Sequence, residues 1–546
     1  MRTKRFAPLL ATAGLLATAV PLLTATGAAA EPAPDYGAPK PAWHRCSPDQ
    51  PVSYECATIK VPLDHRRPQG RTIDLAISRV KSENPAKRHG VLLLNPGGPG
   101  GPGLALPLEM SAALPAEVRE KYDLIGFDPR GVGGSTPITC GMTDAEQNLD
   151  RPYRPETFPS DVAWARTIAD KCREKAGALL PHLNTRNTAR DMDVIRAALG
   201  ERKISYLGYS YGTHLGAVYT QMYPDRADRF VLDSGVDPGR IWRGMFQVWA
   251  TEAEPAFARW TRWTAERDAE FGLGGTPGAV SKSFWDLVAR ADREPVEFEG
   301  LKLTGDNIRS ARPLFFTPAA AAPLIAAVKA AAEGRPRPQG LAVPDAKTVF
   351  GPDRLKAAAP PTASPAAAPA PSGRTTAPQP ASDNGTAAFW AVVCADTDAW
   401  PRDPAQYARD AARDKVKYPL YGDMASNIKP CAFWQRPLEA ATPMTKRAHV
   451  LTVQNEWDSQ TPLVSGQGLH RALKGSRMVL ALGGEGHAVY LVEPNSCVNA
   501  PVSAYLATGR LPGKDITCRT EPTPAERREA LPVPAPSPFP NGPQRF

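Results

Sequence analysis

The pentapeptide Gly-Tyr-Ser-Tyr-Gly at 208–212 constrains the fold of this chain more than any other segment. It joins the apolar, strand-like run 204–207 to a helix-like run that begins near Tyr211. A serine on so tight a turn needs small neighbours two residues to either side, and the turn lifts its hydroxyl above the sheet. The N-terminus of the following helix points free N–H groups at the same place. The context predicts a nucleophile elbow at Ser210, although the pentapeptide alone would also fit an ordinary strand, turn and helix.

A second strand-like run, 91–94, leads directly into a loop of glycine and proline at 95–103. In an α/β-hydrolase this loop supplies one N–H of the oxyanion hole, and the residue after the nucleophile supplies the other. The expected donors are Gly98, with Gly97 as the alternative, and Tyr211. A phosphate-binding loop is the competing interpretation, but the segment lacks the Gly-Lys-Ser/Thr ending of a P-loop and the spacing of a dinucleotide-binding fingerprint.

The acid and the base of such a site follow the serine in that order along the chain. Asp458 comes after a strand-like run, and His487 lies in a glycine-rich loop after a later one. Small residues around His487 let its loop reach over the sheet, so we expect it to be the base. Asp458 is the expected acid. Asp233, at the end of the strand after the elbow helix, and Glu456 are the alternatives.

Several segments carry more specific patterns: 61–64 (Val-Pro-Leu-Asp), 95–100 (Asn-Pro-Gly-Gly-Pro-Gly), 126–135, 208–213, 458–462 and 486–487. On these segments the chain resembles the secreted tripeptidyl aminopeptidases of actinomycetes, within the prolyl-aminopeptidase-like group of α/β-hydrolase serine peptidases. The resemblance runs from about Cys46 to Cys518. It implies that Ser210, Asp458 and His487 are nucleophile, acid and base, and that the enzyme removes short peptides, tripeptides in particular, from a free N-terminus.

The pattern of apolar runs divides the chain. Strand-like and helix-like runs alternate through 31–237, which predicts an α/β fold with a mainly parallel sheet and a ligand crevice at the carboxyl ends of its strands. Helical patterns dominate 238–430, interpreted as a lid inserted into an α/β-hydrolase fold, and 431–518 returns to the sheet with the acid and the base. Within the lid, 357–384 is rich in Pro and Ala and is expected to be a disordered or extended loop, and 519–546 is a similar Pro-rich tail.

Residues 1–30 have the pattern of a secretory signal, with a basic start, an apolar middle and small residues at the cleavage site. A membrane anchor is the alternative, but the apolar stretch is short and is interrupted by Pro21. We therefore expect a secreted, extracellular protein without stable membrane association. The net charge of +9 comes from intermixed basic and acidic residues, which argues against a nucleic-acid partner.

Eight cysteines, an even number, fit an oxidising compartment. Pairing of near neighbours is the expectation, although about 105 pairings are formally open. The absence of any Cys-x-x-Cys pair argues against a zinc site. The expected disulfides are Cys46 with Cys56, Cys140 with Cys172, Cys394 with Cys431, and Cys497 with Cys518.

Acyl transfer to a triad serine needs neither a cofactor nor a metal, and none is expected. An esterase or amidase acting on a small secreted metabolite is the alternative function, because the fold does not choose among acyl compounds. A hydrolase fold used only for binding would predict a broken triad. The expected substrates are peptides with a free N-terminus, whose ammonium group a lid carboxylate can bind. Asp396, in a Cys-x-Asp pattern close to that of the resembled family, is the first candidate and Glu252 is the second.

Overall fold

The computed structural model describes residues 40–351, 381–492 and 496–519. All of them belong to one compact unit, Ala38–Phe546. The expected signal 1–30 lies outside the described residues, as do 357–380 of the Pro/Ala-rich segment and 520–546 of the tail.

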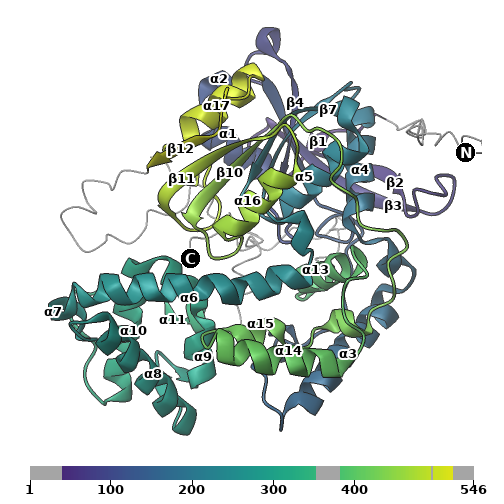
Figure 1. The fold of residues 1–546 in the computed structure, drawn as a ribbon. Coiled ribbons are helices and arrows are strands. Elements are labelled where there is room, and N and C mark those ends of the chain that lie inside the picture. Colours follow the sequence, from purple (N-terminus) through teal and green to yellow (C-terminus); the bar gives the residue numbers. More distant parts are fainter. Residues whose placement is uncertain (1–39, 352–380, 493–495, 520–546) are drawn as a thin grey trace, which may run out of the picture. The chain divides into compact units, whose positions relative to one another are not determined.

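A ten-stranded sheet forms the centre of the fold (Figure 1). Its strand order is β1-β2-β3-β5-β4-β6-β7-β10-β11-β12. The pairs β1–β2, β2–β3 and β3–β5 are antiparallel, and every later pair in this order is parallel. The strands are β1 His44–Arg45, β2 Tyr54–Pro62, β3 Thr72–Val80, β4 Gly90–Asn95, β5 Tyr122–Phe127, β6 Ile204–Tyr209, β7 Ala227–Asp233, β10 Val450–Trp457, β11 Arg477–Glu485 and β12 Ile516–Arg519. The mainly parallel sheet predicted from the sequence is therefore confirmed.

Helices cover both faces of this sheet. Because side chains of a strand alternate between faces, Leu92 and Leu94 of β4 point to the same side, where they join an apolar core with Met110 and Val502. Three helices cover this face: α1 Leu106–Ala113, α2 Ala116–Arg119 and α17 Asn499–Thr508. The opposite face is covered by α4 Thr185–Ala198, α5 Tyr211–Met222 and α16 Leu463–Ala472 (Figure 1).

Residues 238–430, which the sequence predicts to be a lid, lie between β7 and β10 in the chain, and we call this segment the lid. Its helices are α6 Arg243–Ala265, α7 Asp268–Phe271, α8 Pro277–Arg293, α9 Gly305–Ser310, α10 Pro318–Ala332, α11 Ala346–Phe350, α13 Asn384–Ala395, α14 Pro404–Lys417 and α15 Gly422–Ser426. A short hairpin, β8 Val296–Phe298 with β9 Leu301–Leu303, accompanies them. Trp260, Phe284 and Phe315 lie in a buried core made of lid residues, so the insertion packs around its own apolar centre.

One helix that packs against the helices of the lid precedes the lid in sequence. α3 Phe158–Ala176 contacts the segment Pro430–Phe433, and its Trp164 ring meets Trp390 of α13 edge-on at 6.5 Å. Asp161 of α3 accepts a hydrogen bond from Asn427 Nδ2 at 2.9 Å. The sequence division assigned α3 to 31–237, the first part of the α/β-hydrolase core, and that division stays a prediction; in the structure α3 contacts residues on both sides of position 430. An amphipathic helix shows that it has an apolar partner but not which one.

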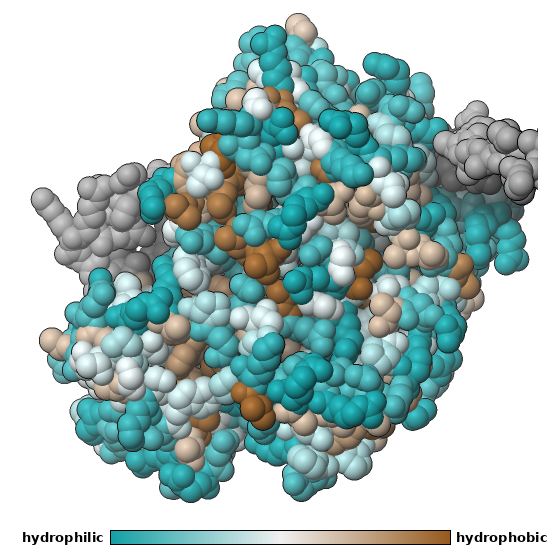
Figure 2. Space-filling model, viewed as in Figure 1, coloured by the Kyte–Doolittle hydropathy of each residue, from teal (hydrophilic) through white to brown (hydrophobic). Residues whose placement is uncertain are grey.

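Four disulfides are present, and they are the near-neighbour pairs expected from the sequence: Cys46–Cys56, Cys140–Cys172, Cys394–Cys431 and Cys497–Cys518. Within the described part of the chain no helix is long and apolar enough to cross a membrane. Figure 2 shows a mostly hydrophilic face, on which apolar side chains gather over the region of β11 and α16.

Candidate active site

The serine of the pentapeptide lies between β6 and α5. Ser210 has φ +56° and ψ −123°, a strained backbone conformation for a residue other than glycine. A Cβ atom on Gly208 would lie 2.7 Å from the carbonyl oxygen of Gly212, and one on Gly212 would lie 2.8 Å from Asn95 Oδ1. Only glycine therefore fits two residues before and two residues after the serine, which is the geometry expected of a nucleophile elbow.

Asp458 and His487 follow the carboxyl ends of β10 and β11, and they contact each other directly. Nδ1 of His487 lies 2.9 Å from each carboxylate oxygen of Asp458, and both residues are buried. Burial alone would raise the pKa of Asp458, but the charge and the hydrogen bond of His487 outweigh it and the pKa is lowered. For His487 burial acts downward, yet Asp458 raises the pKa above its usual value. The pair is thus polarised as a carboxylate and a basic imidazole.

Backbone and hydroxyl groups of the loop after β10 hold the Asp458 carboxylate. Oδ1 accepts hydrogen bonds from the N–H groups of Gln460 and Thr461 at 2.8 and 2.9 Å, and Oδ2 accepts one from Thr461 Oγ1 at 2.9 Å. We call residues 458–461 the acid loop. Glu456, an alternative acid, instead accepts a hydrogen bond from the Gly483 N–H at 2.6 Å.

The end of β7 connects the serine to the histidine loop. The N–H of Ser210 donates to the carbonyl oxygen of Asp233 at 2.9 Å, and the N–H of Ala488 donates to Ser234 Oγ at 2.9 Å. The Asp233 carboxylate accepts from the N–H groups of Val489 and Tyr490. Asp233 therefore binds the backbone after His487 and not the histidine ring. Burial raises the pKa of Asp233 to about 6.

The hydroxyl of Ser210 forms no hydrogen bond with His487 in the described part of the chain. In serine hydrolases without substrate the distance between these two groups is often long, and the hydrogen bond forms when substrate binds.

The loop after β4 lies against the elbow. A Cβ on Gly97 would lie 2.9 Å from Ser210 Cβ and 3.3 Å from the Tyr211 nitrogen. The Gly97 N–H already donates to Asn95 Oδ1 at 3.1 Å, whereas the Gly98 N–H has no acceptor within the residues that the structure describes. Tyr211 begins α5, so its N–H has no intrahelical acceptor. This geometry favours Gly98 over Gly97 as the partner of Tyr211 in an oxyanion hole.

The first turn of α13 packs on the same loop. A Cβ on Gly100 would lie 2.5 Å from the carbonyl oxygen of Gly385. Asn384 is buried; its Oδ1 accepts from the Gly133 N–H at 3.0 Å and its Nδ2 donates to the Gly131 carbonyl at 2.8 Å. The expectation of a disordered or extended loop through residue 384 is therefore wrong at its last residues. Asp383, the residue before Asn384, also accepts hydrogen bonds, from the N–H groups of Cys140 and Met142 at 3.0 and 2.9 Å. The low-complexity composition of the whole segment thus hid two polar side chains with specific partners.

The two acids proposed from the sequence for binding an amine occupy different surroundings. Asp396 is buried and accepts three hydrogen bonds, from the N–H and Oγ1 of Thr185 at 2.7 and 2.6 Å and from Trp242 Nε1 at 3.0 Å. Burial raises its pKa to about 6. Thr185 Oγ1 also lies 2.9 Å from the Tyr211 hydroxyl, so Asp396 supports the residue after the serine.

Glu252 lies on the face of α6 that contacts the acid loop and the end of β11. Trp249, three residues earlier, donates from Nε1 to the Gln460 carbonyl at 2.6 Å, and Arg259, seven residues later, forms an ion pair with Glu485. Residues at such spacings share one side of a helix, which places Glu252 between these contacts. Glu252 is half-buried, and burial raises its pKa.

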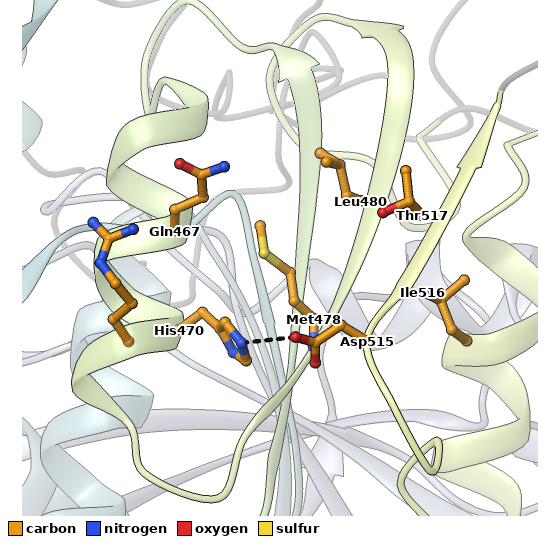
Figure 3. Close-up of a pocket in the computed structure, with 8 residues that line it drawn as sticks. Gln467, His470, Met478, Leu480, Asp515, Ile516 and Thr517 are labelled. Carbon is orange, nitrogen blue, oxygen red and sulfur yellow. Dashed lines mark hydrogen bonds and ion pairs between the residues drawn. The ribbon is translucent and has the colours of Figure 1, made fainter.

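A surface pocket of about 360 Å³ lies elsewhere, between α16, β11 and β12 (Figure 3). Figure 3 shows the contact of His470 Nε2 with Asp515 Oδ2, 3.2 Å apart, among the residues that line it. Met478 lies at the amino end of β11 and Asp515 comes directly before β12, whereas Ser210, Asp458 and His487 follow carboxyl ends of strands. None of the residues predicted for the active site lines this pocket.

Comparisons with known proteins place the chain in a family. Residues 90–277 match a family model described as an alpha/beta hydrolase fold, and residues 418–518 match one described as a TAP-like protein. The chain is 35% identical to a tripeptidyl aminopeptidase of Streptomyces lividans, over 88% of this chain and 87% of the relative.

Two mycobacterial relatives are similar over comparable lengths. Serine protease Hip1 of Mycobacterium tuberculosis is 29% identical, over 85% of this chain and 87% of the relative. Carboxylesterase B of the same species is 30% identical, over 92% and 95%. The α/β-hydrolase topology, the elbow serine and this similarity over most of both chains agree: the chain is a serine hydrolase that belongs to the tripeptidyl aminopeptidase family of α/β-hydrolases.

Proposed function

We propose that the protein is a secreted serine exopeptidase that releases short peptides, tripeptides in particular, from free N-termini. The observation that carries the proposal is the hydrogen bond between His487 and Asp458, formed beside the elbow of Ser210 in a chain whose relatives include tripeptidyl aminopeptidases. The four disulfides and the signal-like pattern of residues 1–30 support secretion.

In the proposed reaction Ser210 Oγ attacks the scissile carbonyl carbon and His487 Nε2 takes the hydroxyl proton. Because Nδ1 faces Asp458, Nε2 is the nitrogen left for the proton transfer. The N–H groups of Gly98 and Tyr211 bind the oxyanion. His487 then gives its proton to the leaving amine, which releases the shortened peptide, and water hydrolyses the acyl-enzyme by the same steps in reverse.

An exopeptidase must recognise the end of its substrate, and the physical handle there is the ammonium group. A partly desolvated carboxylate binds such a group strongly. Among the described residues, the one hydrogen bond that the Glu252 carboxylate accepts is a long one from Thr251 Oγ1 at 3.4 Å, whereas Asp396 already accepts three. We therefore propose Glu252 as the principal amine ligand and Asp396 as a supporting acid behind Tyr211.

The test compares free and N-acetylated peptides that share one scissile bond. Wild-type enzyme should prefer the free peptide strongly, and Glu252→Gln should lose most of that preference. Glu254→Gln is the matched control, because Glu254 lies on the same helix with a raised pKa but accepts a hydrogen bond from the Leu420 N–H at 3.0 Å. Equal cleavage of both peptides by the wild-type enzyme would contradict the aminopeptidase assignment.

A serine esterase or amidase for a small secreted metabolite is the second candidate, and the carboxylesterase relative favours it. Mass spectrometry of a digested peptide library, beside turnover of simple esters, separates the two. Ser210→Ala should lower both activities by several orders of magnitude while the fold is kept. An enzyme that hydrolyses esters but yields no peptide products would be an esterase.

A further inference from the structure

Two hydrogen-bond donors of the lid bind the backbone immediately after Asp458. Arg312 Nη1 donates to the carbonyl oxygen of Ser459 at 2.8 Å. Trp249 Nε1 donates to the carbonyl oxygen of Gln460 at 2.6 Å. The lid therefore contacts the acid loop directly, through two successive carbonyl groups.

The same two peptide groups bind the catalytic carboxylate from their other ends. The Ser459 carbonyl shares its peptide group with the N–H of Gln460, which donates to Asp458 Oδ1 at 2.8 Å. The Gln460 carbonyl shares its peptide group with the N–H of Thr461, which donates to the same oxygen at 2.9 Å. In each of the two peptide groups the carbonyl oxygen thus accepts a hydrogen bond from the lid, and the N–H donates one to Asp458. Hydrogen bonds in such chains polarise and strengthen one another.

Arg312 is a buried cation, and the charge of Asp458 acts on it electrostatically. Arg312 is 3% exposed, and its guanidinium carbon lies 5.1 Å from the centroid of the Trp249 ring and 4.8 Å from that of the Tyr421 ring. Burial lowers the pKa of Arg312 to about 10, while Tyr421 and the charge of Asp458 act in the opposite direction. A buried cation is costly unless opposite charge offsets it. The carboxylate one peptide group away supplies that charge.

We propose that Arg312 and Trp249 are positioning residues for the catalytic acid. By binding two successive carbonyls they fix two N–H groups on Asp458 and thereby orient its carboxylate toward His487. The inference rests on the proposed role of Asp458 as the acid of the triad. It gives the lid a part in turnover that is separate from substrate binding.

Two substitutions remove the donors with little change in shape. Arg312→Met removes the charge and the hydrogen bond but keeps an apolar side chain beside the two rings, and Trp249→Phe removes the N–H but keeps a ring. Arg267→Met is the matched control for the arginine, because Arg267 lies over the Trp263 ring at 4.1 Å and donates to its carbonyl at 2.9 Å within the lid. Trp285→Phe is the control for the tryptophan, because Trp285 packs against the core of the lid.

Kinetics on a peptide substrate and proton NMR of the enzyme without substrate give independent readouts. We expect kcat to fall about 10- to 100-fold in Arg312→Met and about tenfold in Trp249→Phe, with KM changed less than about threefold. The low-field signal of the His487 Nδ1 proton should shift or broaden in both variants, disappear in Asp458→Asn and stay unchanged in the two controls.

Wild-type kcat together with a wild-type proton signal in Trp249→Phe and Arg312→Met would overturn the proposal, and so would a rise in KM alone. Should Arg312→Met fail to fold by circular dichroism, Trp249→Phe decides the question by the same criteria. The NMR readout needs no substrate. An enzyme that cleaves no peptide but whose signal responds to both substitutions would contradict the proposed function and still support this inference.

Discussion

The carboxylate of Asp233 accepts a hydrogen bond from the N–H of Tyr490, 2.7 Å away and three residues beyond His487. With the bonds from Val489 it holds the backbone that carries the histidine, while Asp458 holds the ring. Two aspartates thus divide the support of one imidazole.

The two aspartates should respond differently to the same substitution. Asp458→Asn should lower kcat on the order of 10⁴-fold with little effect on folding, because the imidazole loses its orienting charge. Asp233→Asn should cost about 1–3 kcal/mol of unfolding free energy, because its amide NH₂ cannot accept the N–H groups that it faces. Turnover and urea denaturation of both variants measure the contrast. A larger loss of turnover in Asp233→Asn would transfer the acid role to Asp233.

The pH dependence of kcat/KM should report the raised pKa of His487. Burial acts downward on this pKa, but Asp458 and, to a lesser extent, Asp233 raise it above 6.5. Only the neutral imidazole can take the serine proton, so activity should rise with pH through a midpoint above 6.5. Removing the charge of Asp233 by Asp233→Asn should move this midpoint to lower pH. A midpoint that stays in place would show that Asp233 has no electrostatic influence on the base.

The loop after β4, residues 95–103, is proposed to supply one donor of the oxyanion hole, and we call it the oxyanion loop. Substitution of its glycines should strongly lower activity. A Cβ on Gly97 would lie 2.5 Å from the Tyr209 carbonyl oxygen and would push the loop off the elbow. Gly278 of α8 is the control, because a Cβ there meets nothing within 4 Å. Gly97→Ala should lose turnover by at least about 100-fold, while Gly278→Ala should keep activity and raise stability by up to about 1 kcal/mol. Normal turnover of Gly97→Ala would exclude this loop from the site.

The disulfide Cys394–Cys431 should contribute to the stability of the lid. It closes a loop with a sequence separation of 37 residues, and Cys394 lies two residues before Asp396. Loop-closure entropy predicts about 4 kcal/mol lost in a Cys394→Ala, Cys431→Ala variant. Thermal unfolding of the variant beside the wild type measures this loss, and an unchanged midpoint would refute it.

Local patterns explain which parts of the site were predictable from the sequence. Ser210 and the oxyanion loop each carry their signal within a few residues, and the order of the chain then pointed to Asp458 and His487. The contacts of Arg312 with the acid loop join residues 147 apart, and no periodicity or motif encodes such a contact.

The packing of the lid was less predictable for a related reason. Asn384 is one polar residue at the end of a low-complexity segment, and only the fold shows that its amide meets Gly131 and Gly133. The hairpin β8–β9 consists of strands of three residues, too short for an alternating pattern to stand out.

The contact between Gly100 and the carbonyl of Gly385 has a consequence for protein engineering. Because there is no room for a single methyl group, the lid and the oxyanion loop cannot be exchanged as independent modules. A chimera that takes its lid from a relative would misalign the reaction centre unless the first turn of α13 and the backbone around Gly100 came from the same parent. New substrate preferences should therefore be obtained by substituting side chains within the lid and not by replacing the whole lid.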